Sequence, residues 1–190
     1  MLQLVLASTS PRRLELVRRL GVEPARVAAP AVDEAPRRQE LPRAYALRLA
    51  LAKAHAVDRS PDEAVLAGDT AIALGRRILP PADTPEIQRE LLGKLSGRRH
   101  HCLSAVCVIG PDGKSRTRLS DTTVAFKPLS PQEIEAYIAT GEGLGKAGGY
   151  AIQGRAEAFV RFIHGSHSGV VGLPLFETRA LLRAAGLPVG

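Results

Sequence analysis

Residues 2–21 read LQLVLASTSPRRLELVRRLG, and this stretch predicts a strand, a short loop and a helix in succession. The run over 2–7 is apolar and has the length of a buried strand. Apolar residues recur with helical spacing over 12–20. Ser10 and Pro11 stand where the cap and first residue of a helix belong, and Gly21 follows its end. We therefore expect a strand–loop–helix unit at the start of the fold.

The rest of the chain intersperses helices and strands. We expect strands over 65–74, 102–109, 115–126 and 156–163, the first of them interrupted by the polar residues 68–70. We expect helices over 42–57, 84–95, 130–140 and 172–185. The middle two strands form a hairpin at 111–113, and five glycines within 141–149 indicate a long mobile loop. This arrangement predicts a single domain over 1–190, of the α/β class with a mixed sheet.

Composition supports a folded protein of one domain. The 190 residues are 45% hydrophobic and 24% charged, which excludes a disordered or fibrous chain. The first apolar run is too short to cross a bilayer and lacks the basic start of a signal peptide, so we expect a cytoplasmic protein. Cys102 and Cys107 have an odd separation, which places them on opposite faces of one strand as reduced core residues.

The formal charge of +7 lies mainly in the first 60 residues, which hold 11 Lys/Arg against 6 Asp/Glu. A basic balance can indicate nucleic-acid binding. However, Trp is absent, and 4 Phe and 3 Tyr give few platforms on which bases could stack. The composition therefore favours an anionic small molecule over nucleic acid.

The loop and helix start at 8–13 form the first candidate site. A helix N-terminus presents unpaired N–H groups and a partial positive charge, which suit an anion. Arg12 and Arg13 oppose the helix dipole there, a cost that a bound phosphate chain would reverse. A capped helix with solvated arginines is the alternative, and the spacing alone does not decide between them.

Asp69 is the second candidate, because it follows the apolar segment 65–68 where a strand delivers a side chain to a sheet edge. A carboxylate there can bind a divalent metal or take a proton from water, and an Asp-Thr turn is the alternative. Glu34 and Lys53 are two further candidates. The alternative for Glu34, which follows Asp33, is a loop cap, and the alternative for Lys53 is a solvent-facing position on a helix.

Two other kinds of site find no support. The spacing of His100, His101, His164 and His167 is not that of a zinc site, and we assign these histidines no role. There is no Gly-x-x-x-x-Gly-Lys motif, which excludes a P-loop mechanism.

Five ordered segments together resemble the Maf family of nucleoside triphosphate pyrophosphatases over nearly the whole length. They are LASTSPRR at 6–13, AGDT at 67–70, LSGR at 95–98, KAGGYAIQG at 146–154 and VVGLPL at 170–175. The Ala-Ile-Gln-Gly form of the fourth segment, with Ser-Pro-Arg-Arg in the first, is similar to the branch that acts on dTTP and UTP. The branch that prefers methylated guanine nucleotides is a poorer match.

The resemblance implies an elongated mixed β-sheet flanked by helices, with two lobes around a central nucleotide-binding cleft, as in Maf and inosine triphosphatase folds. It implies hydrolysis of dTTP or UTP to the monophosphate and pyrophosphate, with Mg²⁺, Mn²⁺ or Co²⁺ as cofactor. The expected partner is the nucleoside triphosphate, with neither nucleic acid nor membrane. A homodimer is compatible with the sequence, which does not fix the oligomeric state.

The resemblance also implies roles for individual residues. Asp69 matches the catalytic proton acceptor and, with Glu34, the metal site. The matching substrate-binding positions are Ser8, Arg12, Arg13, Lys53, Thr70 and Gln153, of which Arg12, Thr70 and Gln153 fall at specificity positions.

One departure bears on activity. Pro81 stands where the family usually has a lysine, and proline offers neither a cation nor an N–H to a phosphate. Arg76 and Arg77 are the nearest cations in sequence that could compensate. The alternative function is therefore a nucleotide-binding regulatory protein with little turnover.

Overall fold

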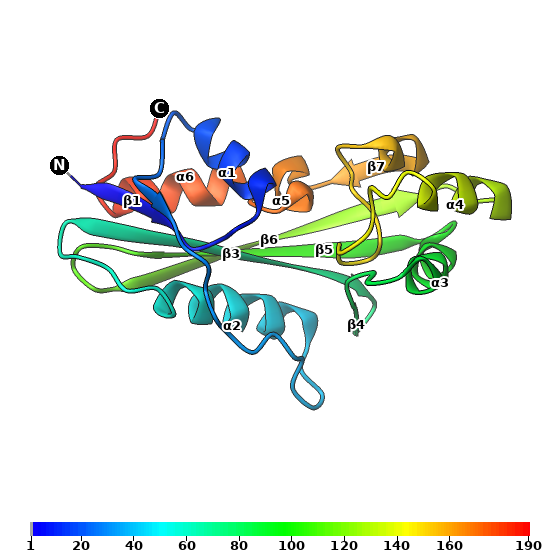
Figure 1. Cartoon of the computed structure of the whole chain (residues 1–190), viewed down its shortest axis with the longest axis horizontal. Helices are drawn as coiled ribbons and strands as arrows, with labels where there is room; N and C mark the ends of the chain where they lie inside the picture. Colours follow the sequence, from blue (N-terminus) through cyan, green and yellow to red (C-terminus); the bar gives the residue numbers. More distant parts are fainter. Residues whose placement is uncertain (1) are drawn as a thin grey trace.

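The structure is a computed structural model that describes residues 2–190. The chain forms a long mixed sheet with helices on both faces (Figure 1). The strands are β1 (Gln3–Leu6), β2 (Arg26–Val27), β3 (Glu63–Leu74), β4 (Arg77–Leu79), β5 (Arg99–Ile109), β6 (Ser115–Phe126) and β7 (Val160–His164). The helices are α1 (Pro11–Arg18), α2 (Pro42–His55), α3 (Pro85–Leu95), α4 (Pro131–Ile138), the 3-10 helix η1 (Arg155–Phe159), α5 (His167–Val171) and α6 (Leu175–Ala184).

The strand order is β2-β1-β3-β5-β6-β7, with β4 paired to β3 off this path. β1 runs parallel to β2 and β3, and the other pairs are antiparallel. The long strands β3, β5 and β6 run the length of the molecule. One lobe gathers around β1, α1 and α6, and the other around α3, α4 and β7 (Figure 1). The predicted α/β class with an elongated mixed sheet is confirmed.

The two faces of the sheet carry different cores. One face holds the larger cluster, to which α1, α3, α4 and α6 contribute leucines and aromatics. The other face packs against α2 through small side chains, with Ala46, Ala50 and Ala54 lying on an alanine-rich part of the sheet. Small residues on both sides allow α2 to approach β3 closely, and this approach positions the site described below.

Cys102 and Cys107 belong to different clusters, which confirms that they lie on opposite faces of β5. Both are buried free thiols, and burial raises their pKa values to about 12 and about 11. They are therefore unreactive core residues at neutral pH.

Most predicted helix boundaries are confirmed. Ser10 is the N-cap of α1 and Pro11 its first residue, and Gly21, with φ of 73°, follows the helix. Thr84 caps α3, and Ser130 forms a capping box with Glu133 at the start of α4. These signals are local in sequence, which is why they could be recognised without the fold.

Three predictions were wrong in part. The polar residues 68–70 do not end or interrupt a strand, because β3 continues through them in register with β5, where Asp69 pairs with Ala105. The predicted strand over 156–163 begins as η1, and only its end forms β7. The predicted helix over 172–185 begins at Leu175, because Gly172 has a φ of 142° and Pro174 is the N-cap.

The segment 141–149 is a loop, as predicted, but backbone hydrogen bonds fasten it to residues 80–82. None of the helices in residues 2–190 is long and apolar enough to span a membrane.

His100 makes the stability of the fold depend on pH. Its side chain is fully buried against Phe126 and Tyr150, with Nε2 2.8 Å from the Tyr150 hydroxyl. Burial lowers the pKa of His100 from 6.5 to about 4. Between about pH 6.5 and about pH 4, His100 is therefore protonated in the unfolded chain and neutral in the folded one. The free energy of unfolding falls as the pH is lowered through this range.

We predict that the free energy of unfolding falls by up to about 3 kcal/mol between about pH 6.5 and about pH 4 because of this group. Urea unfolding of the wild type and His100→Leu across this range measures the effect. The variant should lose the His100 part of the slope, although it is less stable throughout because Tyr150 loses a partner. An identical slope in both proteins would contradict the prediction.

Candidate functional site

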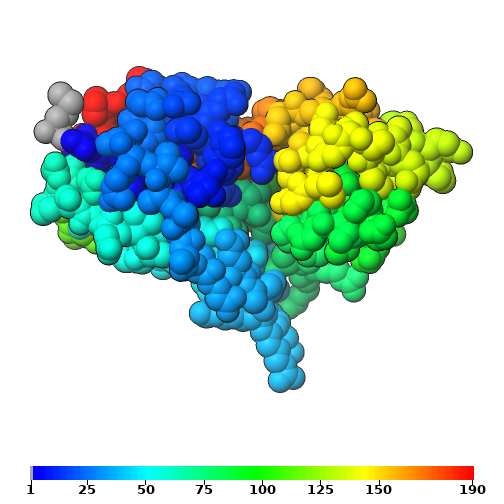
Figure 2. All heavy atoms as spheres, viewed as in Figure 1, coloured from blue at the N-terminus to red at the C-terminus, as the bar shows by residue number. Residues whose placement is uncertain are grey.

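A cleft lies between the two lobes, where the N-terminal segment meets the loop 141–149 and the middle of β3. Figure 2 shows the surface hollowed between the N-terminal residues and those around 140–150. An inner cavity of about 190 Å³ contains Lys53 and Asp69, and an outer one of about 550 Å³ contains Gln153. Ser10, Arg12 and Lys146 line both cavities, so the two are continuous parts of one cleft.

Three charged side chains meet at the base of the inner cavity. Lys53 Nζ lies 2.7 Å from Asp69 Oδ1 and 2.9 Å from Glu34 Oε1. Lys53 and Asp69 are buried, at 7% and 5% exposure. Lys53 is therefore not the solvent-facing helix residue that its position in sequence also suited. Asp33 does form a loop turn, accepting a hydrogen bond from the N–H of Ala35, while Glu34 reaches the cavity.

Burial raises the pKa of Asp69, and the nearby positive charges of Lys53 and Arg13 oppose that rise. The carboxylate therefore has a greater affinity for a proton than an exposed aspartate, yet it stays next to two cations. This combination suits a group that accepts a proton during a reaction.

Arg13 is held by several partners rather than solvated. Its Nε–H donates to the carbonyl of Gly172 at 2.8 Å, and its Nη atoms lie 3.4 Å from Ser8 Oγ and 3.5 Å from Thr70 Oγ1. Burial lowers the pKa of Arg13, while the negative charges of Asp69 and Glu34 oppose that change. The guanidinium is thus fixed beside the carboxylates, and the solvated interpretation is wrong for this arginine.

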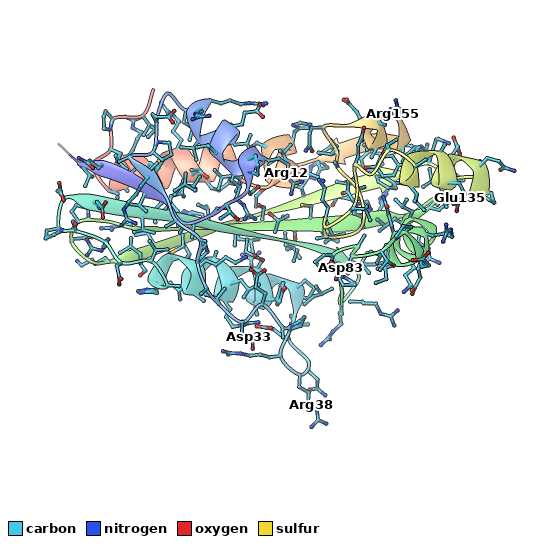
Figure 3. The ribbon with its side chains drawn as sticks, in the orientation of Figure 1. Arg12, Asp33, Arg38, Asp83, Glu135 and Arg155 are labelled. Atoms are coloured by element: carbon cyan, nitrogen blue, oxygen red, sulfur yellow. The ribbon has the colours of Figure 1, made fainter. Side chains whose placement is uncertain are left out.

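Arg12 lies at the N-terminal end of α1, in the middle of the molecule (Figure 3). It lines both cavities, and its side chain has no hydrogen-bond or ion-pair partner among residues 2–190. Burial, together with the adjacent Arg13, lowers its pKa. Ser10 makes no side-chain cap bond to α1, so the first N–H groups of the helix are left without a side-chain acceptor. This end of the cleft is therefore suited to an anion.

Of the remaining predicted residues, Thr70 lines the inner cavity and Gln153 the outer one, while Ser8 lines an adjoining cavity together with Arg13, Glu34 and Lys53. Thr70 Oγ1 is 3.1 Å from Ser104 Oγ and 3.4 Å from the carbonyl of Gly172, and Ser8 accepts a hydrogen bond from the N–H of Ser10. Gln153 is exposed in the outer cavity, apart from the charged cluster. The structure brings seven of the eight predicted site residues together in or beside the inner cavity, and Gln153 lies separately in the outer one.

Sequence reasoning missed other parts of the site. One of these is the carbonyl of Gly172, which orients Arg13. The sequence Gly-Leu-Pro at 172–174 is a local signal for a turn at this carbonyl. Arg76 and Arg77, the cations expected to compensate for Pro81, are exposed around the turn between β3 and β4 and line neither the inner nor the outer cavity. The cation that lies beside Pro81 in the inner cavity is Lys146.

The carboxylates fit a hard divalent cation. Asp69 and Glu34 already converge on one positive group, the Lys53 ammonium. Within residues 2–190 no cluster of three or more His, Cys, Asp or Glu side chains could enclose an ion. Mg²⁺-type ions are commonly held by one or two carboxylates together with substrate phosphates, and this pair of carboxylates matches that pattern.

The fold and the cleft define an α/β protein that holds paired carboxylates and a set of cations ready for a polyanionic ligand. The family model described as Maf-like protein matches residues 3–185, and the chain belongs to this family.

Relatives are similar along nearly the entire chain. A dTTP/UTP pyrophosphatase of Sphingopyxis alaskensis is 68% identical, covering 98% of both chains. One of Novosphingobium aromaticivorans is 61% identical, covering 98% of this chain and 94% of the relative. A HAM1 protein from Coxiella burnetii, 14% identical with a TM-score of 0.54 over 97% of this chain and 100% of its own, shares the fold. The resemblance seen in the sequence is confirmed.

The buried ion pair predicts a coupled effect on stability. Lys53→Met keeps much of the side-chain length but leaves Asp69 buried without its closest cation, which should lower the free energy of unfolding by about 3 kcal/mol near pH 8. In an Asp69→Asn background the same change should cost much less. Urea unfolding of the four proteins in this cycle gives the coupling energy. Equal costs in the two backgrounds would show that the pair does not stabilise the fold.

Proposed function

We propose that this chain is a nucleoside triphosphate pyrophosphatase that hydrolyses dTTP and UTP to the nucleoside monophosphate and pyrophosphate. The observation that carries the proposal is the buried carboxylate Asp69, held beside Lys53 and Arg13 in a cleft that opens at a helix N-terminus. The names of the relatives at 68% and 61% identity support the choice of substrate. A soluble nucleotide substrate also fits the cytoplasmic location expected from the sequence.

The proposed reaction begins with a water molecule beside Asp69. The water oxygen forms a bond to the α-phosphorus as its proton passes to the Asp69 carboxylate, whose raised pKa suits this role. The bond from the α-phosphorus to the bridging oxygen breaks, and pyrophosphate leaves with that electron pair. The residues proposed to stabilise the negative charge on the leaving group are Arg12, Arg13 and Lys53, together with the N–H groups near Ser10. All of them line the inner cavity, which supports this role.

A divalent cation is part of the proposal, with Mg²⁺, Mn²⁺ and Co²⁺ as candidates. Asp69 and Glu34 would hold it, and when bound it would neutralise and polarise the phosphate oxygens. Lys53, which now contacts both carboxylates, keeps them directed at the same place in the cleft.

Recognition of the base is proposed for the outer cavity. Gln153 offers both a donor and an acceptor, which suits the edge of uracil or thymine. Thr70 lies deeper, within hydrogen-bond reach of Arg13, so its expected influence on specificity would act by positioning that arginine.

Asp69→Asn tests the catalytic role. The substitution keeps the shape of the side chain but removes the proton acceptor and one negative charge, so turnover of dTTP should fall by about a hundredfold or more. Pyrophosphate release from a panel of nucleoside triphosphates with each of the three metals measures this, and circular dichroism confirms folding. Near-normal turnover in the folded variant would remove Asp69 from the mechanism. Tight nucleotide binding without turnover by the wild type would favour the regulatory alternative.

Gln153→Ala tests base recognition. It should change the ranking of UTP and dTTP against ATP and GTP in kcat/KM while leaving the melting temperature near that of the wild type, because the side chain is exposed. Gln132→Ala, the same substitution at an exposed position of α4, is the matched control and should leave the ranking unchanged. If the ranking is the same in both variants, the base is recognised elsewhere.

A further inference from the structure

Lys146 occupies a position that the proposed mechanism leaves without a role. It lies on the loop 141–149 and lines both the inner and the outer cavity, opposite the start of α1. Its ammonium group has no hydrogen-bond or ion-pair partner among residues 2–190, whereas Lys53, the other lysine in the inner cavity, is paired with two carboxylates. An ammonium at the cavity wall that has no protein acceptor is free to make a charge-assisted contact with a bound anion.

The backbone of Lys146 is fixed rather than free to swing away. Its carbonyl accepts a hydrogen bond from the N–H of Ala82 at 3.1 Å, and the N–H of Gly145 donates to the carbonyl of Ala82 at 2.9 Å. Pro81 and Ala147 form an antiparallel bridge between the same two segments. Lys146 is thereby anchored to the segment 80–82. That segment contributes Pro81, which carries no charge, to the inner cavity.

The other side of the loop is also held. The buried side chain of Gln88 donates to the carbonyl of Gly149 at 3.0 Å. Gly148 has a φ of 71°, and a Cβ there would lie 3.0 Å from Ile72 Cγ2, so a side chain at this position would be strained and would crowd β3. The backbone that carries Lys146 is therefore held in a defined position at the cavity wall.

Lys146 and Arg12 repel one another across the cleft. Burial lowers the pKa of Lys146, and the positive charge of Arg12 lowers it further, while Glu142 opposes the change. The Glu142 carboxylate accepts a hydrogen bond from the backbone N–H of Arg155 and makes no ion pair with Lys146. Two cations that face one cavity and have no protein acceptor are stabilised by an anion between them.

We propose that Lys146 is a phosphate-binding residue that, together with Arg12, holds the triphosphate chain at the part of the cavity wall where Pro81 carries no charge. This inference rests on the proposed function for the identity of the anion. Arg76 and Arg77 do not line either cavity, so they are not candidates for this contact.

The first test separates binding from chemistry. Lys146→Met should raise KM for dTTP by about ten- to hundredfold, the value of one charge-assisted contact, and change kcat less. Lys146→Arg should recover most of the loss because it keeps the charge. Lys114→Met removes one charge from the exposed turn between β5 and β6 and should behave as the wild type. An unchanged KM in Lys146→Met would overturn the inference.

The second test does not need turnover. Calorimetric titration with inorganic tripolyphosphate should show Lys146→Met binding about ten- to hundredfold more weakly than the wild type and Lys114→Met binding equally well. If the wild type binds tripolyphosphate through Lys146 but hydrolyses no nucleotide, the inference stands and the proposed function fails. If it hydrolyses dTTP but Lys146→Met binds tripolyphosphate normally, the function stands and the inference fails.

A charge relocation tests the link to position 81. Adding Pro81→Lys to Lys146→Met places a lysine on the segment bridged to the loop, and we expect it to restore part of the lost tripolyphosphate affinity. Restoration would support the view that the two positions serve one phosphate group. No restoration in a folded double variant would overturn the claim that Lys146 and position 81 face the same phosphate group.

Discussion

The ion pair between Lys53 and Asp69 is the interaction on which the arrangement of the cleft depends. Both side chains are buried between α2 and β3, and separating them would leave a charge in the interior at a cost of several kcal/mol. The pair can form only because alanines on α2 and on the facing sheet bring helix and strand close together. The charged cluster therefore depends on the close packing that the small residues of α2 and the sheet allow.

A second close approach fixes the opposite side of the cleft. A Cβ on Gly68 would lie 3.2 Å from Leu173 Cδ1 and 3.3 Å from the carbonyl of Ala105, so the residue before Asp69 has little room for a side chain. This contact brings the turn after α5 onto β3, where the Gly172 carbonyl accepts a hydrogen bond from Arg13. Residues far apart in the sequence are positioned together around one carboxylate.

Much of the fold could be predicted because its signals are local. The hairpin of β5 and β6, the caps of α3 and α4, and the first strand and helix follow from periodicity and turn residues. The course of β3 through residues 68–70 could not be predicted, because pairing with β5 on one side overrides the turn preference of Gly-Asp-Thr. The burial of Lys53 and the place of Lys146 likewise depend on partners in other elements, which neither helical spacing nor a glycine-rich composition reveals.

The proposed reaction requires the cleft to direct water to the α-phosphorus and to hold pyrophosphate as the leaving group. Hydrolysis of dTTP in water enriched in the heavy oxygen isotope, followed by mass spectrometry of the products, tests it most directly. We expect the isotope to appear in dTMP and the released pyrophosphate to be unlabelled. Label in the pyrophosphate would place the attack on the β-phosphorus and contradict the proposed reaction.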